Sequence, residues 1–442
     1  MADENSLDAK YRRNKKIWEA EQERLREVAK ARAEGKRVKD ADKGIPTMLF
    51  EALPARYGDC LFLTFPRPGD RPLRLLIDGG PAGVYASSLK KRLDEEAKAF
   101  PAEKPLALDA VMISHIDEDH ILGVLDLFSA IQDADQRRAP RPYQPKWLLH
   151  NSFDGLLGEG EGNAARALDS PTVLAGLGGE LAFADAKSLT ARLVLQSYGQ
   201  GSKLASIAAA LRIVRNPPDQ RLLTLDPKAP RVLQIGDAKL TVVGPLQSGI
   251  DNLRKEWLKW KAKQTKKDTA SLAELSVSLD TSVPNLSSIV VLLEVNGAKL
   301  LLTGDALGDQ VVTGLEQAGI IAKGGVLDVD LLKLPHHGSI RNVTPKLLKQ
   351  VRAKHYVASG DGTYGNPDRD TLLLIEKIRP EGGYTVHLTY DAASCDVTHQ
   401  AWGKGRKGQE YDPAKHSIAE VVARWRAEGK IMVEEGPVKI QF

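Results

Sequence analysis

Two histidines and two aspartates lie within the six-residue segment His115-Ile116-Asp117-Glu118-Asp119-His120. The run 108–114 before it is apolar apart from Asp109 and Ser114, which is typical of a short buried strand. The polar side chains therefore follow the end of that strand. Imidazole nitrogens and carboxylate oxygens are ligands that divalent metals take from proteins. A solvated loop could hold the same residues, but apolar residues flank the segment on both sides, so we predict a metal site here.

Four further segments place a residue that can bind metal after an apolar or turn-forming stretch. They contain Asp78 after 75–77, Asp305 after 301–304, His336 and His337 after 331–335, and Asp368 after 364–367. Each alone is commonly a turn or cap residue. Ligand sites of α/β proteins lie outside the carboxyl ends of their strands. Several such residues in one chain therefore favour a shared site at one edge of a sheet.

The elements that must position these residues alternate between strand and helix. The patterns predict strands at 48–53, 60–65, 73–77, 239–243, 288–293, 299–302 and 355–358. They predict helices at 86–99, 345–352 and 416–428. Strands interspersed with helices predict an α/β sandwich rather than a helical bundle.

The chain has 442 residues, enough for one large domain with additions or for two domains. Residues 1–46 predict a charged helical extension, in which acidic and basic residues interleave. We expect the main domain to span 47–380, with a Lys-rich helical insert at about 250–280. Residues 381–442 are expected to supply further strands and a helix that complete or decorate that domain.

Composition excludes several classes of protein. No apolar run reaches the roughly 20 residues that cross a bilayer, and the first residues lack a signal-peptide pattern. Only two cysteines are present, so we expect neither a disulfide framework nor a Cys-type zinc site, and we expect a cytoplasmic protein. The net charge of +4 is too small to indicate nucleic-acid binding by itself.

Taken in chain order, these motifs resemble those of metallo-β-lactamase-fold hydrolases, and within them the soluble hydrolase domain of ComEC-type DNA-uptake proteins. The resemblance covers about residues 47–380 and implies an αββα sandwich that holds one or two metal ions. The matching motifs are Gly58-Asp59-Cys60, Leu76-Ile77-Asp78-Gly79-Gly80, the segment 114–120, Asn285-Leu286-Ser287-Ser288, Leu302-Thr303-Gly304-Asp305-Ala306, 334–339 and Tyr364-Gly365.

Two departures from the family pattern bear on the metal. Asp117 stands where most of the superfamily has a second histidine, and Asn366-Pro367-Asp368 stands where the ComEC-like branch has His-Pro-His. Both replace nitrogen by oxygen donors, which shifts the preference from Zn²⁺ towards Mn²⁺ or Mg²⁺. The membrane channel of ComEC proteins has no counterpart here, so a role in DNA uptake is not implied.

The resemblance implies a role for each candidate residue. His115 and Asp117 would hold one metal, Asp119 and His120 the second, and Asp305 would bridge them or bind the second. His336 and His337 would complete the ligands or contact a phosphate. His150 stands near the family's middle histidine and is either a ligand or a structural residue. Asp368 is either a ligand or a helix cap, and Asp78 would orient the ligands without touching the metal.

The function implied is a metal-dependent hydrolase, foremost a phosphodiesterase or nuclease that attacks with metal-activated hydroxide. Asp117, Asp119 and His337 would be its catalytic residues, and the basic stretches 253–267 and 341–354 its contacts to a nucleic-acid backbone. Two alternatives stay open. One is a hydrolase of a small cyclic nucleotide, lactone or ester. The other is an interaction protein with a degenerate metal site, which would bind a protein partner through the N-terminal helix and the central insert.

Overall fold

The computed structural model describes residues 48–67, 70–158, 199–264 and 287–442. The predicted helical extension at 1–46 lies outside these ranges, as does the part of the predicted insert beyond residue 264.

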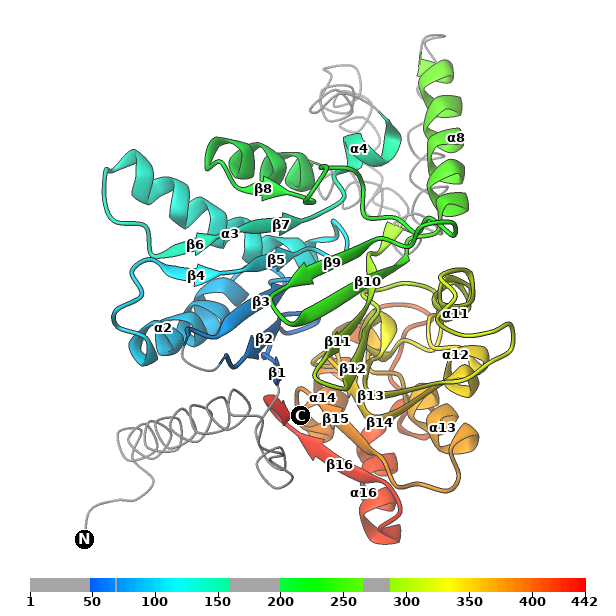
Figure 1. The fold of residues 1–442 in the computed structure, drawn as a ribbon. Coiled ribbons are helices and arrows are strands. Elements are labelled where there is room, and N and C mark those ends of the chain that lie inside the picture. The colour runs from blue at the N-terminus through cyan, green and yellow to red at the C-terminus, as the bar shows by residue number, and fades with distance from the viewer. Residues whose placement is uncertain (1–47, 68–69, 159–198, 265–286) are drawn as a thin grey trace, which may run out of the picture.

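Two β-sheets face each other, and helices cover the outer face of each sheet (Figure 1). The buried side chains form three apolar layers. The middle layer lies between the sheets and joins Phe50 and Leu75 of the first to Leu240 and Leu300 of the second. The outer layers pack the helices onto the sheets. This is the αββα sandwich that the resemblance to metallo-β-lactamase-fold proteins implied, and that prediction is confirmed.

The first sheet runs in the order β17-β1-β2-β3-β5-β7-β8 and the second in the order β16-β15-β14-β13-β12-β11-β10-β9. Strands of the first sheet are β1 (Leu49–Ala52), β2 (Leu61–Phe65), β3 (Leu73–Ile77), β5 (Ala110–Met112), β7 (Trp147–Leu149), β8 (Val214–Arg215) and β17 (Val438–Gln441). Strands of the second are β9 (Val232–Ile235), β10 (Ala238–Gly244), β11 (Val290–Val295), β12 (Ala298–Leu302), β13 (Leu327–Lys333), β14 (Val351–Ala358), β15 (Thr385–Leu388) and β16 (Met432–Glu435). A separate pair joins β4 (Leu106–Leu108) to β6 (Tyr143–Pro145).

Helices connect and cover these strands. They are η1 (Tyr85–Leu89), α2 (Lys90–Ala99), α3 (Glu118–Gln136), α4 (Phe153–Leu157), α8 (Gln247–Gln264), α11 (Gly308–Gln317), η2 (Pro335–Gly338), α12 (Pro345–Gln350), η3 (Thr363–Gly365), α13 (Arg369–Ile378), α14 (Ala392–Gly403), α15 (Pro413–His416) and α16 (Ile418–Glu428). A further helical stretch lies between residues 199 and 210.

Parallel pairing at the centre of each sheet brings strand ends together. In the first sheet β5 lies parallel to both β3 and β7. In the second, β12, β13, β14 and β15 run parallel to one another. The carboxyl ends of neighbouring parallel strands meet at one edge, so loops after β3, β5, β12 and β13 can converge there.

The elements follow the sequence pattern with small differences. The helix predicted at 345–352 ends at Gln350, because Val351 and Arg352 already pair with β13. The insert is present as α8, which begins at Gln247. After residue 381, β15 and β16 extend the second sheet, whereas β17 returns to the first sheet beside β1.

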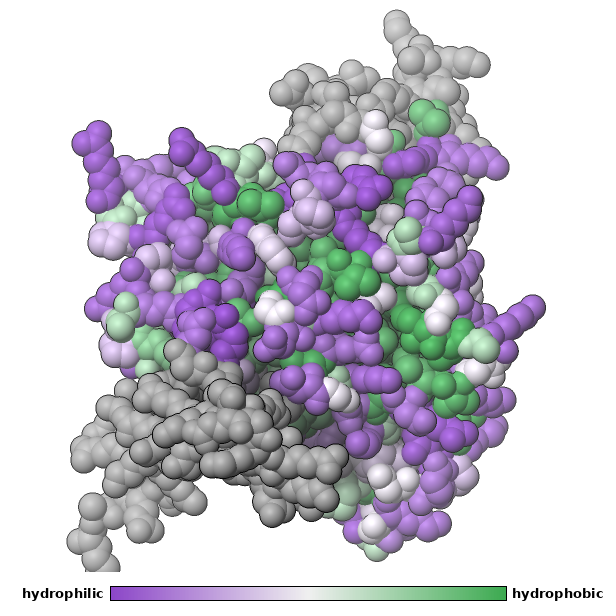
Figure 2. Space-filling model, viewed as in Figure 1, coloured by the Kyte–Doolittle hydropathy of each residue, from purple (hydrophilic) through white to green (hydrophobic). Residues whose placement is uncertain are grey.

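The face seen in Figure 2 is mostly hydrophilic, with patches of hydrophobic residues between hydrophilic ones. Within the described ranges, no helix combines the length and apolar content that crossing a membrane would require.

Candidate metal centre

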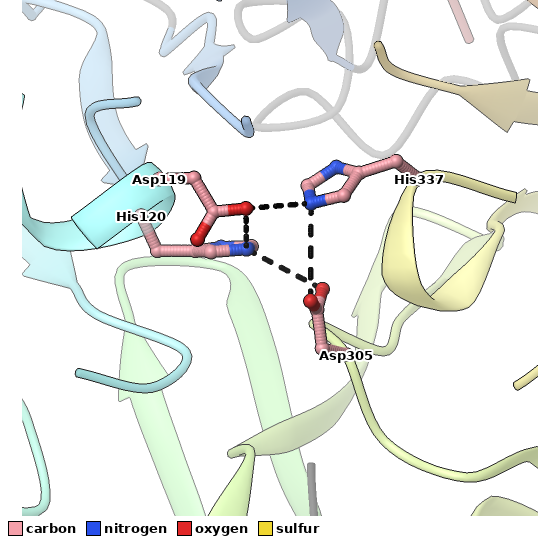
Figure 3. Close-up of side chains that lie close together, drawn as sticks. All are labelled: Asp119, His120, Asp305 and His337. Carbon is pink, nitrogen blue, oxygen red and sulfur yellow. Dashed lines mark hydrogen bonds and ion pairs between the residues drawn. The ribbon is translucent and has the colours of Figure 1, made fainter. Parts of the chain in front are cut away.

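Four side chains from both halves of the chain meet at the edge of the sandwich. Asp119 and His120 lie on the first turn of α3, Asp305 follows β12, and His337 follows β13 (Figure 3). One donor atom of each residue lies within 4.8 Å of those of the other three. His120 Nε2 is 3.4 Å from Asp305 Oδ1, and His337 Nε2 is 3.1 Å from Asp119 Oδ2. The structure therefore brings together four of the residues that the sequence singled out.

A second group adjoins the first on the side of β5. His115, Asp117 and Asp119 also place donor atoms within 4.8 Å of one another. His115 Nε2 is 3.4 Å from Asp117 Oδ2 and 3.7 Å from Asp305 Oδ2. Asp305 of the first group thus also lies close to His115 of the second, which is where a carboxylate shared by two ions must lie. The arrangement suits one ion or a pair.

Short loops and a helix end explain why these side chains converge. Asp117 is the N-cap of α3, so Asp119 and His120 fall in its first turn. A helix N-terminus carries a partial positive charge, which favours carboxylates at that position. The turn is held close to the loop after β3, since Gly79 N donates to His120 O at 2.7 Å.

Glycines make this close approach possible. A Cβ on Gly123 would lie 2.0 Å from Gly79 O, and one on Gly58 would lie 2.0 Å from Asp119 O. Neither position admits a side chain unless the backbone moves, which ties the loop that contains Gly58 directly to the metal centre.

Three of the atoms that could bind a metal lack hydrogen-bond partners. His115 Nε2, His120 Nε2 and Asp305 Oδ1 are buried and have no hydrogen-bond partner among the described residues. Buried polar atoms are nearly always hydrogen-bonded, so three such atoms facing one point need another explanation. A divalent cation between them satisfies all three, and the mixed imidazole and carboxylate donors fit such an ion.

Electrostatics at the centre also favour a cation. Burial by itself lowers the pKa of His337, but Asp305 and Asp59 outweigh it and raise that pKa to about 9. In the same way carboxylates raise the pKa of His120 well above its ordinary value. Burial raises the pKa of Asp305, but the imidazoles around it bring that pKa well below its usual range. The negative potential that favours protons on these imidazoles also favours a divalent ion between them.

Asp78 orients His120 from behind. Its Oδ2 lies 2.9 Å from His120 Nδ1, and its two oxygens accept from Ser114 N and Ser114 Oγ, each at 2.7 Å. These bonds fix Nδ1 as the protonated nitrogen and leave Nε2 to face the centre. Ser114 Oγ also lies 3.1 Å from His115 Nδ1, so His115 is aligned through the same serine. The predicted role of Asp78 as an orienting residue remains a prediction, which this geometry supports.

Asp59 was missed as a site residue, although its Gly-Asp motif entered the resemblance. Asp59 is 1% exposed, and its Oδ2 lies 2.7 Å from Nζ of Lys333, which is equally buried. Its Oδ1 lies 3.3 Å from His337 Nδ1 and accepts from Ser359 Oγ. Ser359 Oγ also lies 3.1 Å from His337 Nδ1, so Asp59 aligns His337 both directly and through this serine. The sequence did contain a signal for Lys333, because it is the one charged residue in the otherwise apolar run 331–334.

His336 lies beside the centre but outside the four-residue group. Its Nε2 is 3.6 Å from Asp305 Oδ2, and its Nδ1 is 2.9 Å from Asn342 Oδ1. Asn342 Nδ2 donates to Asp305 O at 2.8 Å, which turns the amide oxygen towards His336. Both His336 and His337 have left-handed backbones, with φ of 50° and 55°. Such conformations are unfavourable for these residues and cluster at functional sites.

Two further candidate ligands, Asp368 and His150, lie outside these groups as well. The carboxylate of Asp368 accepts from Ile340 N at 2.8 Å and from Ser339 Oγ at 3.4 Å, so it braces the loop after His337. It occupies the N-cap position of α13, but its side chain makes no capping hydrogen bond there. His150 is 1% exposed, and burial lowers its pKa to about 4. Neither of its ring nitrogens has a hydrogen-bond partner among the described residues.

No protein-family model matches this sequence, and no curated protein matches it either. Among solved structures, similarity is found to CmlA, a diiron β-hydroxylase from Streptomyces venezuelae, at 11% identity and a TM-score of 0.33. That match covers 89% of this chain and 54% of CmlA, so the chain spans about half the length of that protein. Zn²⁺-bound PqqB from Methylobacterium extorquens matches at 12% identity and a TM-score of 0.31, over 86% of this chain and 87% of PqqB. Neither likeness bears on the chemistry of this chain.

Proposed function

We propose that the protein is a metal-dependent phosphodiesterase. The observation that carries the proposal is the pair of adjoining donor groups that share Asp119 and contain buried atoms without hydrogen-bond partners. Divalent ions held there would polarise a phosphoryl group and activate water for attack. His115, Asp117 and Asp305 would hold one ion, and Asp119, His120, His337 and Asp305 the other.

The protein's own groups supply positioning and proton transfer. Asp117 is the most open carboxylate of the centre, with 30% of its side chain exposed, and it accepts the proton of the attacking water. Asp78 and Asp59 hold His120 and His337 in one orientation, which limits the reorganisation needed during reaction. His336 lies beside Asp305 with one-third of its side chain exposed, so it would contact a phosphate oxygen of a bound substrate.

The donor set favours Mn²⁺ or Mg²⁺ over Zn²⁺ on the side of His115, because Asp117 supplies oxygen there. The same proposal has four further parts. The protein is related to the ComEC-type hydrolase domain and acts on nucleic acid. Residues 253–267 and 341–354 contact the nucleic-acid backbone, and the protein works in the cytoplasm.

The test combines metal content with turnover. The protein is purified with Mn²⁺, metal per chain is measured, and hydrolysis of bis-p-nitrophenyl phosphate is followed for wild type and Asp119→Asn. The matched control is Asp126→Asn, an exposed aspartate further along α3. We expect Asp119→Asn to lower turnover more than about 100-fold. Loss of a residue that only orients a metal ligand costs about 10- to 100-fold, and Asp119 would bind the metal itself. Absence of both bound metal and turnover in the wild type would refute the proposal.

A further inference from the structure

A row of aromatic side chains begins beside the metal centre. The Tyr57 and Tyr364 rings meet edge to face with centroids 5.3 Å apart, and the Tyr364 and Trp402 rings meet at 5.5 Å. Tyr57 comes from the loop between β1 and β2, Tyr364 from η3, and Trp402 from α14. We term these three residues the aromatic ridge.

The ridge is fixed to the centre at its Tyr57 end. Tyr57 Oη donates to Glu118 Oε1 at 3.3 Å, and Glu118 immediately precedes Asp119. The neighbouring Gly58 packs against the backbone of Asp119, and Asp59 N donates to Asp119 O at 3.2 Å. A group attached to a phosphate at the metal centre would therefore lie against the ridge.

Tyr364 is placed in a way that folding does not explain. Its side chain is 54% exposed, and its φ of 63° lies in the left-handed region that tyrosine rarely adopts. Exposure of an aromatic face gives up the gain from burial, and the backbone conformation is unfavourable as well. An aromatic ring held open in this way is suited to stacking with a planar ligand.

Basic side chains flank the ridge. The Arg56 guanidinium lies over the Tyr57 ring at 5.2 Å, and the Arg406 guanidinium lies over the Trp402 ring at 4.9 Å. Lys404, Arg406 and Lys407 form an exposed loop directly after α14, which we term the basic loop. Aromatic faces for bases combined with cations for phosphates are the two elements of single-stranded nucleic-acid recognition.

We infer that the aromatic ridge is a nucleoside subsite: a nucleobase adjoining the scissile phosphodiester stacks on Tyr364, and the basic loop binds the phosphates that follow. The inference rests on the proposed phosphodiesterase function and assigns its substrate class. It goes further in giving Tyr364 a role in specificity, since that residue contacts the base and not the reacting phosphate.

The first test compares two esters with the same leaving group, thymidine 5′-p-nitrophenyl phosphate and methyl p-nitrophenyl phosphate. The ratio of their kcat/KM values measures what the nucleoside contributes. We expect Tyr364→Ala to lower this ratio roughly 5- to 100-fold, the range for loss of one stacked base, and Tyr364→Phe to restore it. The control is Arg137→Gln, an exposed arginine at the far end of α3. An unchanged ratio, or an equal loss on both esters, would overturn the inference.

The second test uses binding without turnover. Anisotropy of a labelled single-stranded 12-mer is measured in EDTA, for wild type, Tyr364→Ala and the triple variant Lys404→Gln/Arg406→Gln/Lys407→Gln. We expect both variants to bind more weakly, and the triple variant to show a shallower salt dependence, by about 0.7 in the log–log slope per lost phosphate contact. If the triple variant binds the 12-mer more weakly but hydrolyses the thymidine ester normally, the site takes a polymer. If both activities fall equally, the site takes a single nucleotide.

The two tests separate this inference from the proposed function. Binding of the 12-mer that depends on Tyr364, without hydrolysis of any diester, would leave the nucleoside subsite standing and refute the phosphodiesterase. Hydrolysis of both esters at a ratio that Tyr364→Ala does not change would leave the phosphodiesterase standing and refute the subsite.

Discussion

The buried ion pair between Asp59 and Lys333 predicts an unusual pattern of stability and metal affinity. Both side chains are 1% exposed and their charged atoms are 2.7 Å apart. Burial raises the pKa of Asp59, but Lys333 and His337 lower it by more, so the carboxylate is charged in the fold. Removal of Lys333 takes away the nearer of the two cations beside this buried carboxylate and leaves it with only His337 and Ser359, and breaking a buried ion pair costs about 3–5 kcal/mol. Lys333→Met should therefore lower the free energy of unfolding by that amount.

The double variant Asp59→Leu/Lys333→Met should recover most of this loss, to within about 1 kcal/mol of wild type, because both charges are replaced by apolar groups. Its metal affinity should not recover. His337 Nδ1 has lost its carboxylate, and loss of such a partner lowers affinity about 10- to 100-fold. The double variant should thus regain stability relative to Lys333→Met without regaining metal affinity.

The assay is guanidinium unfolding in EDTA, followed by tryptophan fluorescence, with Mn²⁺ affinity measured by calorimetry on the same proteins. Trp425 is fully buried beneath the second sheet and reports loss of its core. Lys239→Met is the matched control, since the Lys239–Glu294 pair is 3.0 Å long but exposed, and should contribute less than about 1 kcal/mol. The reasoning is refuted if Lys333→Met costs no more than Lys239→Met, or if the double variant is less stable than both single variants.

Three further predictions concern other parts of the fold. Asp78→Ala should weaken Mn²⁺ binding about 10- to 100-fold with unchanged circular dichroism, because His120 loses its partner; equal affinity would contradict this. Gly123→Ala should destabilise by about 1–3 kcal/mol, seen as a lower melting temperature, because its Cβ would lie 2.0 Å from Gly79 O. Burial lowers the pKa of His387 to about 4, so between pH 6.5 and 4 the unfolded chain binds a proton more readily than the folded one. The free energy of unfolding should therefore fall as the pH falls, by about 1 kcal/mol per pH unit. His387→Gln should flatten that slope in urea titrations at pH 7, 6 and 5, and a slope equal to wild type would argue against this account.

The sequence allowed the sandwich and most of the centre to be predicted, because both depend on local pattern. A residue directly after a buried parallel strand must lie at the sheet edge, whatever the rest of the chain does. This held for Asp305 after β12 and for the segment after β5. The same pattern at His150 after β7 did not bring that residue into the donor groups, since a strand end fixes the edge but not the direction of the side chain.

Contacts between distant segments could not be predicted in this way. Asp59 lies in the loop between β1 and β2 of the first sheet, whereas Lys333 ends β13 of the second, and no spacing in the sequence records that they meet. The aromatic ridge is a similar case, because Tyr57, Tyr364 and Trp402 come from three separate loops and helices. Such pairs become visible only when the two halves of the chain are packed together.

The pairing of β1 with β17 has a consequence for synthesis of the chain. β1 ends at Ala52 and β17 begins at Val438, so 385 residues lie between the two strands. At about 5–20 residues per second, ribosomes need roughly 20 to 80 s to make that stretch. Throughout this time β1 has an open edge, and open edges recruit other chains. The first sheet can receive its last strand only after translation has passed Gln441. This sandwich is therefore expected to depend on chaperones that shield nascent strands.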